Sequence, residues 1–333
     1  MGEFELLERI RERLGAGGSR VAVGSGDDAS VTVPGGATAT SVDALVEGVH
    51  FRRDHASLAQ IGHKALATAL SDLAAMGAEP GEAYVFLGVP ASLDEAGVLE
   101  LLDGMLELAE QTGTTLAGGD ISRAPALTLA TTVVGHAAAP RDFVTRAGAR
   151  EGDVLAVTGE LGGAAAGLLL LEKGADRAVD HTGAGLTAQS VVHELVERQL
   201  APTPRIAAGQ ALARVGATAM IDISDGLGGD ARHLAAASEV GLRIDASALP
   251  LNAGLREVAA AVGGDPLELA VSGGEDYELL ATLPPDRFER AVEAVVEAGT
   301  TLARVGDVAR GEGVEIRLPG GEPLKATGFD QLG

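Results

Sequence analysis

The chain has 333 residues with an ordinary globular composition, 46% hydrophobic and 22% charged, and this length is enough for two domains. Its 48 acidic and 25 basic residues give a net charge of −23, which disfavours binding to nucleic acid or to an anionic membrane. The absence of Cys excludes disulfides, thiolate metal sites and thiol nucleophiles. No signal peptide is recognisable and the longest apolar stretch, 161–171, is too short to span a bilayer, so we expect a cytoplasmic protein.

Short β-like runs alternate with longer helical patterns, which predicts a mixed α/β protein. An amphipathic helix opens the chain. Strands are then expected at 21–23, 29–33, 38–42, 84–89, 114–117 and 127–134. Helices are expected at 57–76, behind Ser57, and at 94–112, behind Asp94. On the first of these two helices, Lys64 is expected at the surface.

An irregular, relatively basic stretch at 136–153 suits a connection between domains, and we place the boundary near Arg150. The expected domains are therefore 1–149 and 150–333. In the second domain, strands are expected at 154–158, 219–223, 242–245, 278–283 and 303–308. Helices are expected at 164–172, 188–200, 205–215, 255–262 and 287–297.

Acidic residues recur just after β-like runs, in turns rich in glycine or serine. The segments are VAVGSGDD (Asp27, Asp28), TATSVD (Asp43), TLAGGD (Asp120), AMIDISDG (Asp222, Asp225) and VSGGED (Glu275, Asp276). A further acid, Asp72, lies in a helix among small and apolar residues. If these acids converge at one end of a sheet, they must be neutralised by protons or by a metal ion, and we favour the metal.

Oxygen ligands without Cys favour Mg²⁺, Mn²⁺ or Ca²⁺ over zinc. The segment DISDG does not fit a calcium loop, whereas Mg²⁺ commonly binds one or two carboxylates together with substrate phosphates. We therefore infer magnesium and a polyphosphate substrate. The segment GSGDDA matches a dinucleotide-binding pattern in letters, but its two carboxylates would repel a pyrophosphate, and the chain has no P-loop motif.

Each of these residues also has a purely structural interpretation. Asp-rich turns are common, Asp225 could be the N-cap of the helix that follows it, and Glu275 with Asp276 could only close a glycine turn. Similarly, His50 could be a packed histidine, and Arg146 could form a linker ion pair. The composition and the spacing of the acids alone leave these alternatives open.

Eight motifs, taken together and in their order, resemble one known family. They are GSGDDAS, SVDALVEGVHF, KALATALSDLAAMGAEP, LAGGDISRAP, VTRAGAREGDVLAVTG, PTPRIAAGQAL, AMIDISDGLGGDARHL and VSGGEDYELL. In this respect the chain resembles the thiamine-monophosphate kinases, in the superfamily that includes aminoimidazole ribonucleotide synthetase. The resemblance implies a two-domain α/β (α+β type) fold, and a homodimer joined through N-terminal sheets with nucleotide bound at or near that interface.

The resemblance also implies ATP-dependent phosphorylation of thiamine monophosphate to thiamine diphosphate, with ATP as co-substrate and several Mg²⁺ ions. The family's magnesium-binding positions fall on Asp28, Ser41, Val42, Asp43, Asp72, Asp120, Asp222 and Asp225. Its ATP-contacting positions fall on Gly119, Asp120, Arg146 and Ser224, and its substrate positions fall on His50 and Glu275. Where the family often has S-T-D, this chain has Val42 in the middle, so only the backbone carbonyl can be a ligand there.

The acceptor in this reaction is an ionised phosphate monoester, so no general base is needed and charge neutralisation is the main task. Two rival functions remain. One is a sister purine-pathway synthetase that uses ATP to activate an amide, and the other is a non-catalytic sensor of nucleotide or divalent cations. Relatives that make selenophosphate or mature hydrogenase use Cys or selenocysteine, and the absence of Cys disfavours both.

Overall fold

The computed structural model describes residues 3–14, 18–24, 29–174, 186–262, 264–318 and 320–324. The chain divides into two compact units, which are residues 1–73 with 78–142 and residues 74–77 with 143–333. Asp27 and Asp28 of the first acidic motif lie outside the described residues.

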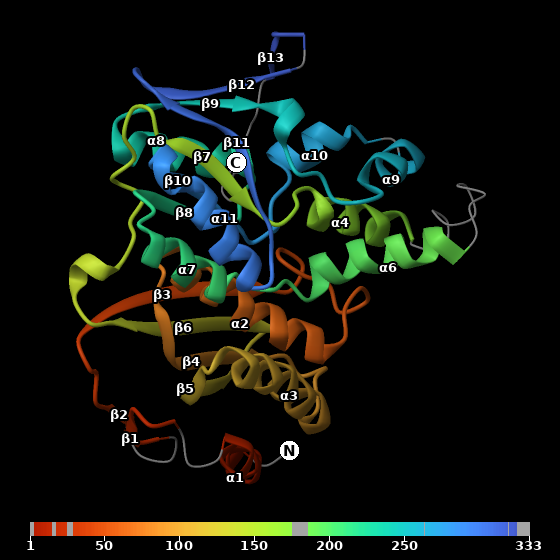
Figure 1. The fold of residues 1–333 in the computed structure, drawn as a ribbon. Coiled ribbons are helices and arrows are strands. Elements are labelled where there is room, and N and C mark those ends of the chain that lie inside the picture. The colour runs from red at the N-terminus through yellow and green to blue at the C-terminus, as the bar shows by residue number, and fades with distance from the viewer. Residues whose placement is uncertain are drawn as a thin grey trace. The chain divides into compact units, whose positions relative to one another are not determined.

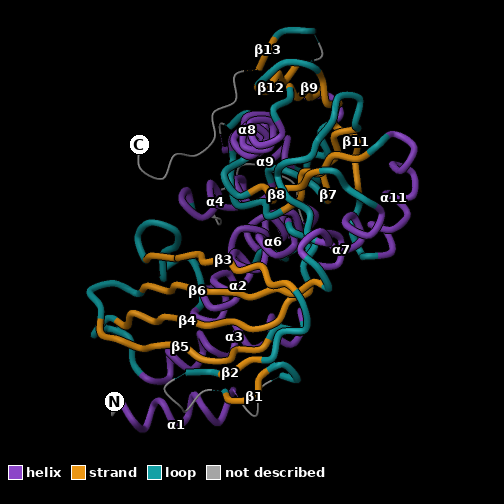
Figure 2. Tube along the Cα trace, turned by 90° about the vertical axis from the view of Figure 1, so that its left-hand side faces the viewer, coloured by secondary structure: helices purple, strands orange, loops and turns teal. Residues whose placement is uncertain are grey.

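The first unit is built on a four-stranded sheet with the strand order β3-β6-β4-β5 (Figures 1 and 2). Its strands are β3 (Ala37–Val46), β4 (Glu79–Val89), β5 (Thr115–Arg123) and β6 (Thr128–Ala137). Its helices are α1 (Glu3–Leu14), α2 (Leu58–Ala75) and α3 (Glu95–Thr112), and a small hairpin is formed by β1 (Val21–Val23) and β2 (Val31–Thr32). Only the β4–β5 pair is parallel.

The helices of this unit follow from local signals in the sequence. Asp94 caps α3 by accepting a hydrogen bond from the Gly97 N–H at 3.0 Å, and Gly113 ends the helix at a φ of 71°. Glycine also brings α2 and α3 into close contact, since a Cβ on Gly104 would lie 2.0 Å from the Ala59 carbonyl oxygen. Almost the whole surface of α2 is buried, which explains its small and apolar sequence.

The two faces of the four-stranded sheet differ in exposure. One face carries Leu87, Leu129 and Val133, which are at most 8% exposed. The opposite face carries Val42 and Phe86, which are 65% and 39% exposed. Ser41 contacts Asp72 of α2 and therefore lies on the buried face, and strand alternation places Asp43 on that face too.

The second unit is built on a seven-stranded mixed sheet with the strand order β13-β12-β9-β11-β7-β10-β8. Its strands are β7 (Val154–Thr158), β8 (Ala219–Ile223), β9 (Gly241–Asp245), β10 (Glu278–Leu283), β11 (Leu302–Ala309), β12 (Gly313–Arg317) and β13 (Pro323–Leu324). Its helices are α4 (Gly163–Lys173), α6 (Leu186–Leu200), α7 (Ile206–Val215), α8 (Leu227–Ser238), α9 (Leu255–Val262), α10 (Pro266–Ser272) and α11 (Phe288–Glu297).

The helices of the second unit pack against its sheet and against one another. Helix α8 packs against β8 and β12, and α7 packs against α11. Helix α4 packs against α6, α9 and α10. Every residue of β7, β8 and β10 is buried, so the polar residues on these strands, Asp222 and Glu278 among them, need partners inside the protein.

Most of the predicted elements are present, and the differences have physical reasons. Strands β7, β8 and β10 coincide with the predicted ranges because each is a continuous buried apolar run. The prediction of a β-like run just before Gly273 is wrong, because Asp265 and Pro266 begin helix α10 there. Lys64 is 3% exposed rather than on the surface, because α2 is enclosed on nearly all sides.

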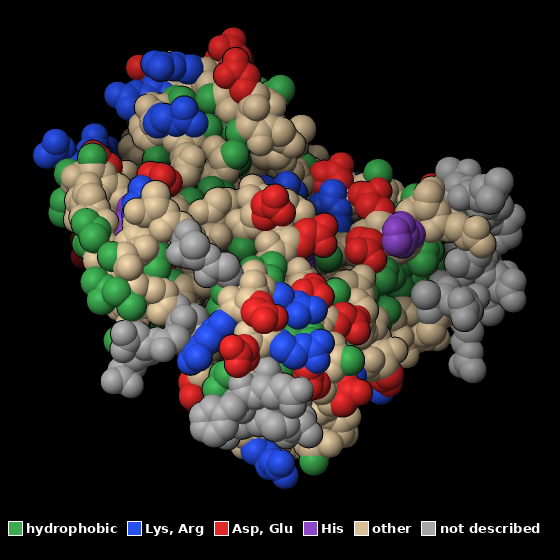
Figure 3. Space-filling model, turned by 90° about the horizontal axis from the view of Figure 1, so that it is seen from below, with side chains coloured by type: hydrophobic (Ala, Val, Ile, Leu, Met, Phe, Trp, Pro, Cys, Tyr) green, Lys and Arg blue, Asp and Glu red, His purple; other side chains and the backbone are tan. Residues whose placement is uncertain are grey.

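The surface charge is mixed on the face seen in Figure 3. There, Asp and Glu side chains lie interspersed with Lys and Arg. Ion pairs join some of the acidic and basic side chains of the protein, for example Arg13 with Asp103 at 2.8 Å. None of the helices in the described ranges is both long and apolar enough to traverse a lipid bilayer.

Candidate functional site

In the first unit, the structure brings Ser41 of β3 together with Asp72 of α2, and the Ser41 hydroxyl donates a hydrogen bond to the Asp72 carboxylate. Asp43 lies two residues along on the same face, and its carboxylate accepts the Ala44 N–H at 2.8 Å. The Val42 side chain points to the opposite face. Val42 therefore has only its backbone carbonyl to offer a ligand on the Asp43 side of the sheet.

Thr131 is a further polar residue beside Asp43, and the sequence patterns did not reveal it. It is the register partner of Asp43, and its side chain is 1% exposed. Its hydroxyl has no hydrogen-bond partner among the described residues. A buried hydroxyl without a partner is costly, so its presence beside Asp43 fits a position that receives a polar ligand.

His50 is held by the turn that follows β3. The Val46 N–H donates to Nδ1 of the His50 ring at 3.1 Å, and the His50 N–H donates to the Val46 carbonyl at 2.9 Å. A backbone N–H can only donate, so Nδ1 must be the unprotonated nitrogen of a neutral ring. The proton of that ring is therefore on Nε2, which leaves His50 with one donor to offer a ligand.

Gly119 and Asp120 lie at the opposite edge of the sheet from Asp43. The pairs Asp120 with Phe86, Phe86 with Ala130 and Ala130 with Ala44 form one row across the four strands. Three strand spacings separate its ends, which is ~14 Å. Asp120 also shares the open face with Phe86, whereas Asp43 lies on the buried face, so these two carboxylates of one chain do not meet.

The expectation that Asp43 and Asp120 follow the ends of strands is wrong. Both lie inside strands, because β3 and β5 continue beyond the apolar runs that revealed them. Glycines and acids are rare in strands, yet here Asp120 keeps its register with Phe86. Within the described residues, no three His, Asp or Glu side chains are grouped in a way that could hold a metal ion.

In the second unit, Asp222, Ser224 and Asp225 lie at the end of β8. Asp222 is 4% exposed and belongs to the strand, while Ser224 and Asp225 form the turn after it. The Asp230 carboxylate holds this turn, since it accepts the N–H groups of Ser224 and Asp225 at 3.0 Å each. The interpretation of Asp225 as an N-cap is wrong, because the N-cap of α8 is Gly226, at a φ of 101°.

The pKa of Asp230 is affected by the acidic residues at this turn. The pKa of its carboxyl is raised from 3.8 to about 7, chiefly by burial and also by the nearby charges of Asp222 and Asp225, although the two backbone N–H donors lower it. The turn therefore concentrates negative charge in a poorly solvated place. Asp230 lies within the AMIDISDGLGGDARHL motif but follows no β-like run, so the pattern of acids did not reveal it.

Glu275 lies beside the same turn. Its N–H donates to the Ser224 carbonyl at 2.8 Å, and Tyr277 donates in the same way to Ile223 at 2.9 Å. The Glu275 carboxylate accepts a hydrogen bond from Gln199 Nε2 at 2.5 Å. The structure thus brings the predicted substrate residue Glu275 next to the predicted ATP-contacting residue Ser224.

Arg146 is attached to the same unit through its backbone. Its carbonyl accepts the Ser238 hydroxyl at 2.8 Å, and the neighbouring Thr145 carbonyl accepts the Met220 N–H at 3.0 Å. The Arg146 side chain is exposed. It therefore lies on the chain segment that runs beside β8, with a guanidinium that is accessible to an anionic ligand.

Both parts of the chain match models of AIR synthase related proteins. Residues 26–137 match the N-terminal domain of that family and residues 150–319 match its C-terminal domain. These matches and the two sheets described above define the class, a two-domain α/β protein of the AIR synthase related type. The fold class expected from the motifs is confirmed.

Comparison with individual relatives shows which family within this class the chain resembles. The thiamine-monophosphate kinase of Mycobacterium tuberculosis (strain CDC 1551 / Oshkosh) is 40% identical over 286 residues, which cover 84% of this chain and 80% of that protein. The crystal structure of thiamine-monophosphate kinase from Stenotrophomonas maltophilia K279a is 36% identical, with a TM-score of 0.82 and coverage of 97% and 98% of the two chains. AaThiL complexed with AMPPCP and TMP is 31% identical, with a TM-score of 0.75 and coverage of 98% and 96%. The chain belongs to the thiamine-monophosphate kinase family.

Proposed function

We propose that this protein transfers the γ-phosphoryl group of ATP to the phosphate of thiamine monophosphate, giving thiamine diphosphate and ADP. Family membership supports this function, as does the related AaThiL, which was solved with AMPPCP and TMP. The observation that carries the proposal is the arrangement in the second unit. There, the backbone joins Glu275 directly to Ser224, next to the acidic turn of Asp222 and Asp225.

The candidate metal ligands fit Mg²⁺ in their chemistry. In the described residues, Ser41, Asp43, Asp72, Asp120, Asp222 and Asp225 offer hard oxygen atoms, and Asp28 belongs to the same proposed set. The charges that raise the pKa of Asp230 are ones that a divalent cation would neutralise. Bound Mg²⁺ would supply charge neutralisation and in-line orientation of the two phosphates.

The remaining residues have roles that follow from their own chemistry. The acceptor phosphate carries about −1.5 to −2 charges at neutral pH, so it is already a nucleophile and no residue needs to remove a proton from it. Arg146 can offer a guanidinium fork to phosphate oxygens, and His50 can donate its Nε2–H to an acceptor on the substrate. Thiamine carries a positively charged thiazolium ring and an amino group, both of which suit the Glu275 carboxylate.

The separation of Asp43 from Asp120 supports a homodimer in which two chains complete each site. We assign Ser41, Asp43 and Asp72 of one chain and Gly119 and Asp120 of the partner to the same nucleotide. The open face of the four-stranded sheet, with exposed Val42 and Phe86, is the surface proposed to join the two chains. In this proposal, residues 1–149 bind ATP and Mg²⁺ and form the dimer, and residues 150–333 complete the phosphate and substrate site.

Mixing two inactive variants tests this arrangement. Asp43→Asn and Asp120→Asn should each nearly abolish turnover while leaving the fold intact. Random exchange of subunits between them gives mixed dimers with one intact site, so the mixture should recover about a quarter of wild-type activity. Sites built within single chains would give no recovery, and wild-type activity in either variant would contradict the metal assignment.

A substrate panel tests the reaction itself. Purified protein with ATP and Mg²⁺ should form ADP with thiamine monophosphate and not with thiamine. Turnover only with an aminoimidazole precursor would instead identify a purine-pathway synthetase, and ATP binding without any ADP formation would identify a sensor.

A further inference from the structure

The loop between α10 and β10 has an unusual backbone conformation around Asp276. Its two neighbours, Glu275 and Tyr277, have positive φ angles of 68° and 49°. Among the described residues, only one other non-glycine residue, Glu239, has a positive φ. Residues other than glycine adopt this region only at an energetic cost, so the surrounding structure must hold the loop in place.

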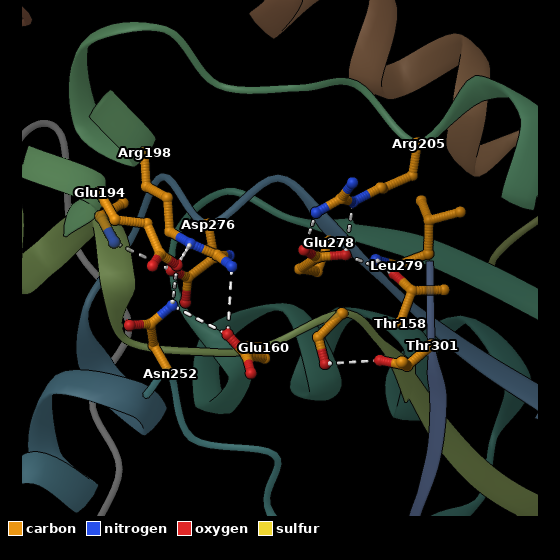
Figure 4. A network of polar contacts seen from close by, with 12 residues as sticks. Thr158, Glu160, Glu194, Arg198, Arg205, Asn252, Asp276, Glu278, Leu279 and Thr301 are labelled. Atoms are coloured by element: carbon orange, nitrogen blue, oxygen red, sulfur yellow. Dashed lines mark hydrogen bonds and ion pairs between the residues drawn. The ribbon is translucent and has the colours of Figure 1, made fainter. Parts of the chain in front are cut away.

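The Asp276 carboxylate holds the loop from its centre. It accepts the N–H groups of Gly162 at 2.8 Å and Ala164 at 3.3 Å, which lie at the first turn of α4 (Figure 4 shows its position). Helix α4 has no capping side chain of its own, because its N-cap is Gly162. Asp276 therefore takes the place of a local N-cap from more than a hundred residues away in the sequence.

A capping side chain at Gly162, the N-cap position of α4, could not replace Asp276. Gly162 has a φ of 82°, and a Cβ at this position would lie 2.7 Å from the Leu255 side chain and 3.2 Å from the Ala270 backbone. Ser, Thr, Asn or Asp are thus disfavoured at the N-cap of α4. The first-turn N–H groups of α4 need an acceptor from elsewhere, and the position of Asp276 meets that need.

The loop also carries the candidate substrate residue. The Glu275 peptide is bonded to the Ser224 carbonyl, and its side chain is turned toward Gln199, which is 4% exposed. A change in the backbone at Asp276 would rotate Glu275 out of both contacts. We propose that Asp276 is a positioning residue, which holds Glu275 in its left-handed conformation by capping α4 and thereby sets the affinity for thiamine monophosphate. This inference rests on the proposed function, in which Glu275 contacts that substrate.

The test compares Asp276→Ala with Asp94→Ala, a matched control that removes the side-chain cap of α3 in the other unit. Asp276→Ala should raise KM for thiamine monophosphate at least ~10-fold with a smaller change in kcat, because the substrate residue is displaced. Asp276→Asn retains one carbonyl acceptor and should recover part of the affinity. Asp94→Ala should leave both constants near their wild-type values, and equal effects of the two alanine variants would overturn the proposal.

A double-mutant cycle shows whether Asp276 acts through Glu275. In a Glu275→Gln background, Asp276→Ala should raise KM little further, because the affected contact is already lost. If the two substitutions instead raise KM by factors that multiply in the double variant, Asp276 does not act through Glu275 and the positioning role is contradicted.

Hydrogen exchange provides a readout that does not depend on activity. Asp276→Ala should lower the amide protection of 162–164 and 275–277, and unchanged protection would refute the cap itself. Wild-type protein that fails to phosphorylate thiamine monophosphate would refute the proposed function and, with it, the role assigned toward this substrate. A loss of protection in Asp276→Ala would then support the cap alone.

Discussion

Replacing Arg205 by Ala should strongly destabilise the protein, because it leaves the buried carboxylate of Glu278 without its cation. Glu278 lies on β10 and is 0% exposed, while the Arg205 side chain, at the start of α7, is 21% exposed. The guanidinium donates to both carboxylate oxygens, at 2.8 Å and 2.5 Å, and the Thr158 hydroxyl donates a third bond at 2.7 Å (Figure 4).

The size of the effect follows from this burial. Breaking a buried, hydrogen-bonded ion pair by removing one partner typically costs about 3–5 kcal/mol. Among the described residues, only the Thr158 hydroxyl would still donate a hydrogen bond to the Glu278 carboxylate. The partial exposure of Arg205 allows water to replace some of the lost contacts, so we expect a value near the lower end, ~3 kcal/mol.

Urea unfolding monitored by circular dichroism measures this loss. The control is Arg310→Ala, which breaks an ion pair with Glu151 of similar length, 2.7 Å, between side chains that are 87% and 55% exposed. Arg310→Ala should lower the free energy of unfolding by less than ~0.5 kcal/mol. The double variant Arg205→Met/Glu278→Met should recover much of the stability lost in Arg205→Ala. A loss below ~1 kcal/mol in Arg205→Ala, or one equal to that of the control, would refute the reasoning.

Three further predictions follow from single contacts. Nitrogen NMR of the His50 ring should place its proton on Nε2, because Nδ1 accepts the Val46 N–H, and a proton on Nδ1 alone would contradict this. Gly104→Ala should lower the free energy of unfolding by about 1–3 kcal/mol, since its Cβ would press on the Ala59 carbonyl, and unchanged stability in urea would show that the helices separate freely. Burial raises the pKa of Asp276 from its ordinary 3.8 to about 7. Between about pH 4 and about pH 7 the folded protein therefore binds more protons at this residue than the unfolded chain does. In the absence of metal, the free energy of unfolding should fall as the pH rises through this range, by up to ~1.4 kcal/mol per pH unit. Asp276→Asn should flatten that fall in urea titrations at several pH values, and an identical slope in the two proteins would contradict the shift.

The sequence predicted the buried strands well and the polar strand ends poorly. Strand β8 (AMIDI) is an apolar run whose hydrophobicity outweighs its single acid, so its limits were predicted correctly. Strand β5 continues through Gly118, Gly119 and Asp120, residues that disfavour strands, and pairing with β4 extends it there. That pairing is a tertiary effect which no local pattern contains.

The candidate site shows the same division between local and tertiary information. Motifs identified Asp43 and Asp120, but their separation depends on the strand order β3-β6-β4-β5, which periodicity does not reveal. Gln199 carries no signal at all, because its contact with Glu275 joins residues 76 positions apart. Asp276 was predicted only as one of the acids that follow β-like runs or as part of a glycine turn, since a cap supplied across 114 residues cannot be read from the spacing.

The fate of the γ-phosphoryl group tests the proposed function most directly. With ATP radiolabelled at the γ-phosphate, Mg²⁺ and thiamine monophosphate, we predict that the label appears in thiamine diphosphate, in equal amount to the ADP formed. Label released as inorganic phosphate, with no labelled thiamine diphosphate, would contradict phosphoryl transfer to this acceptor.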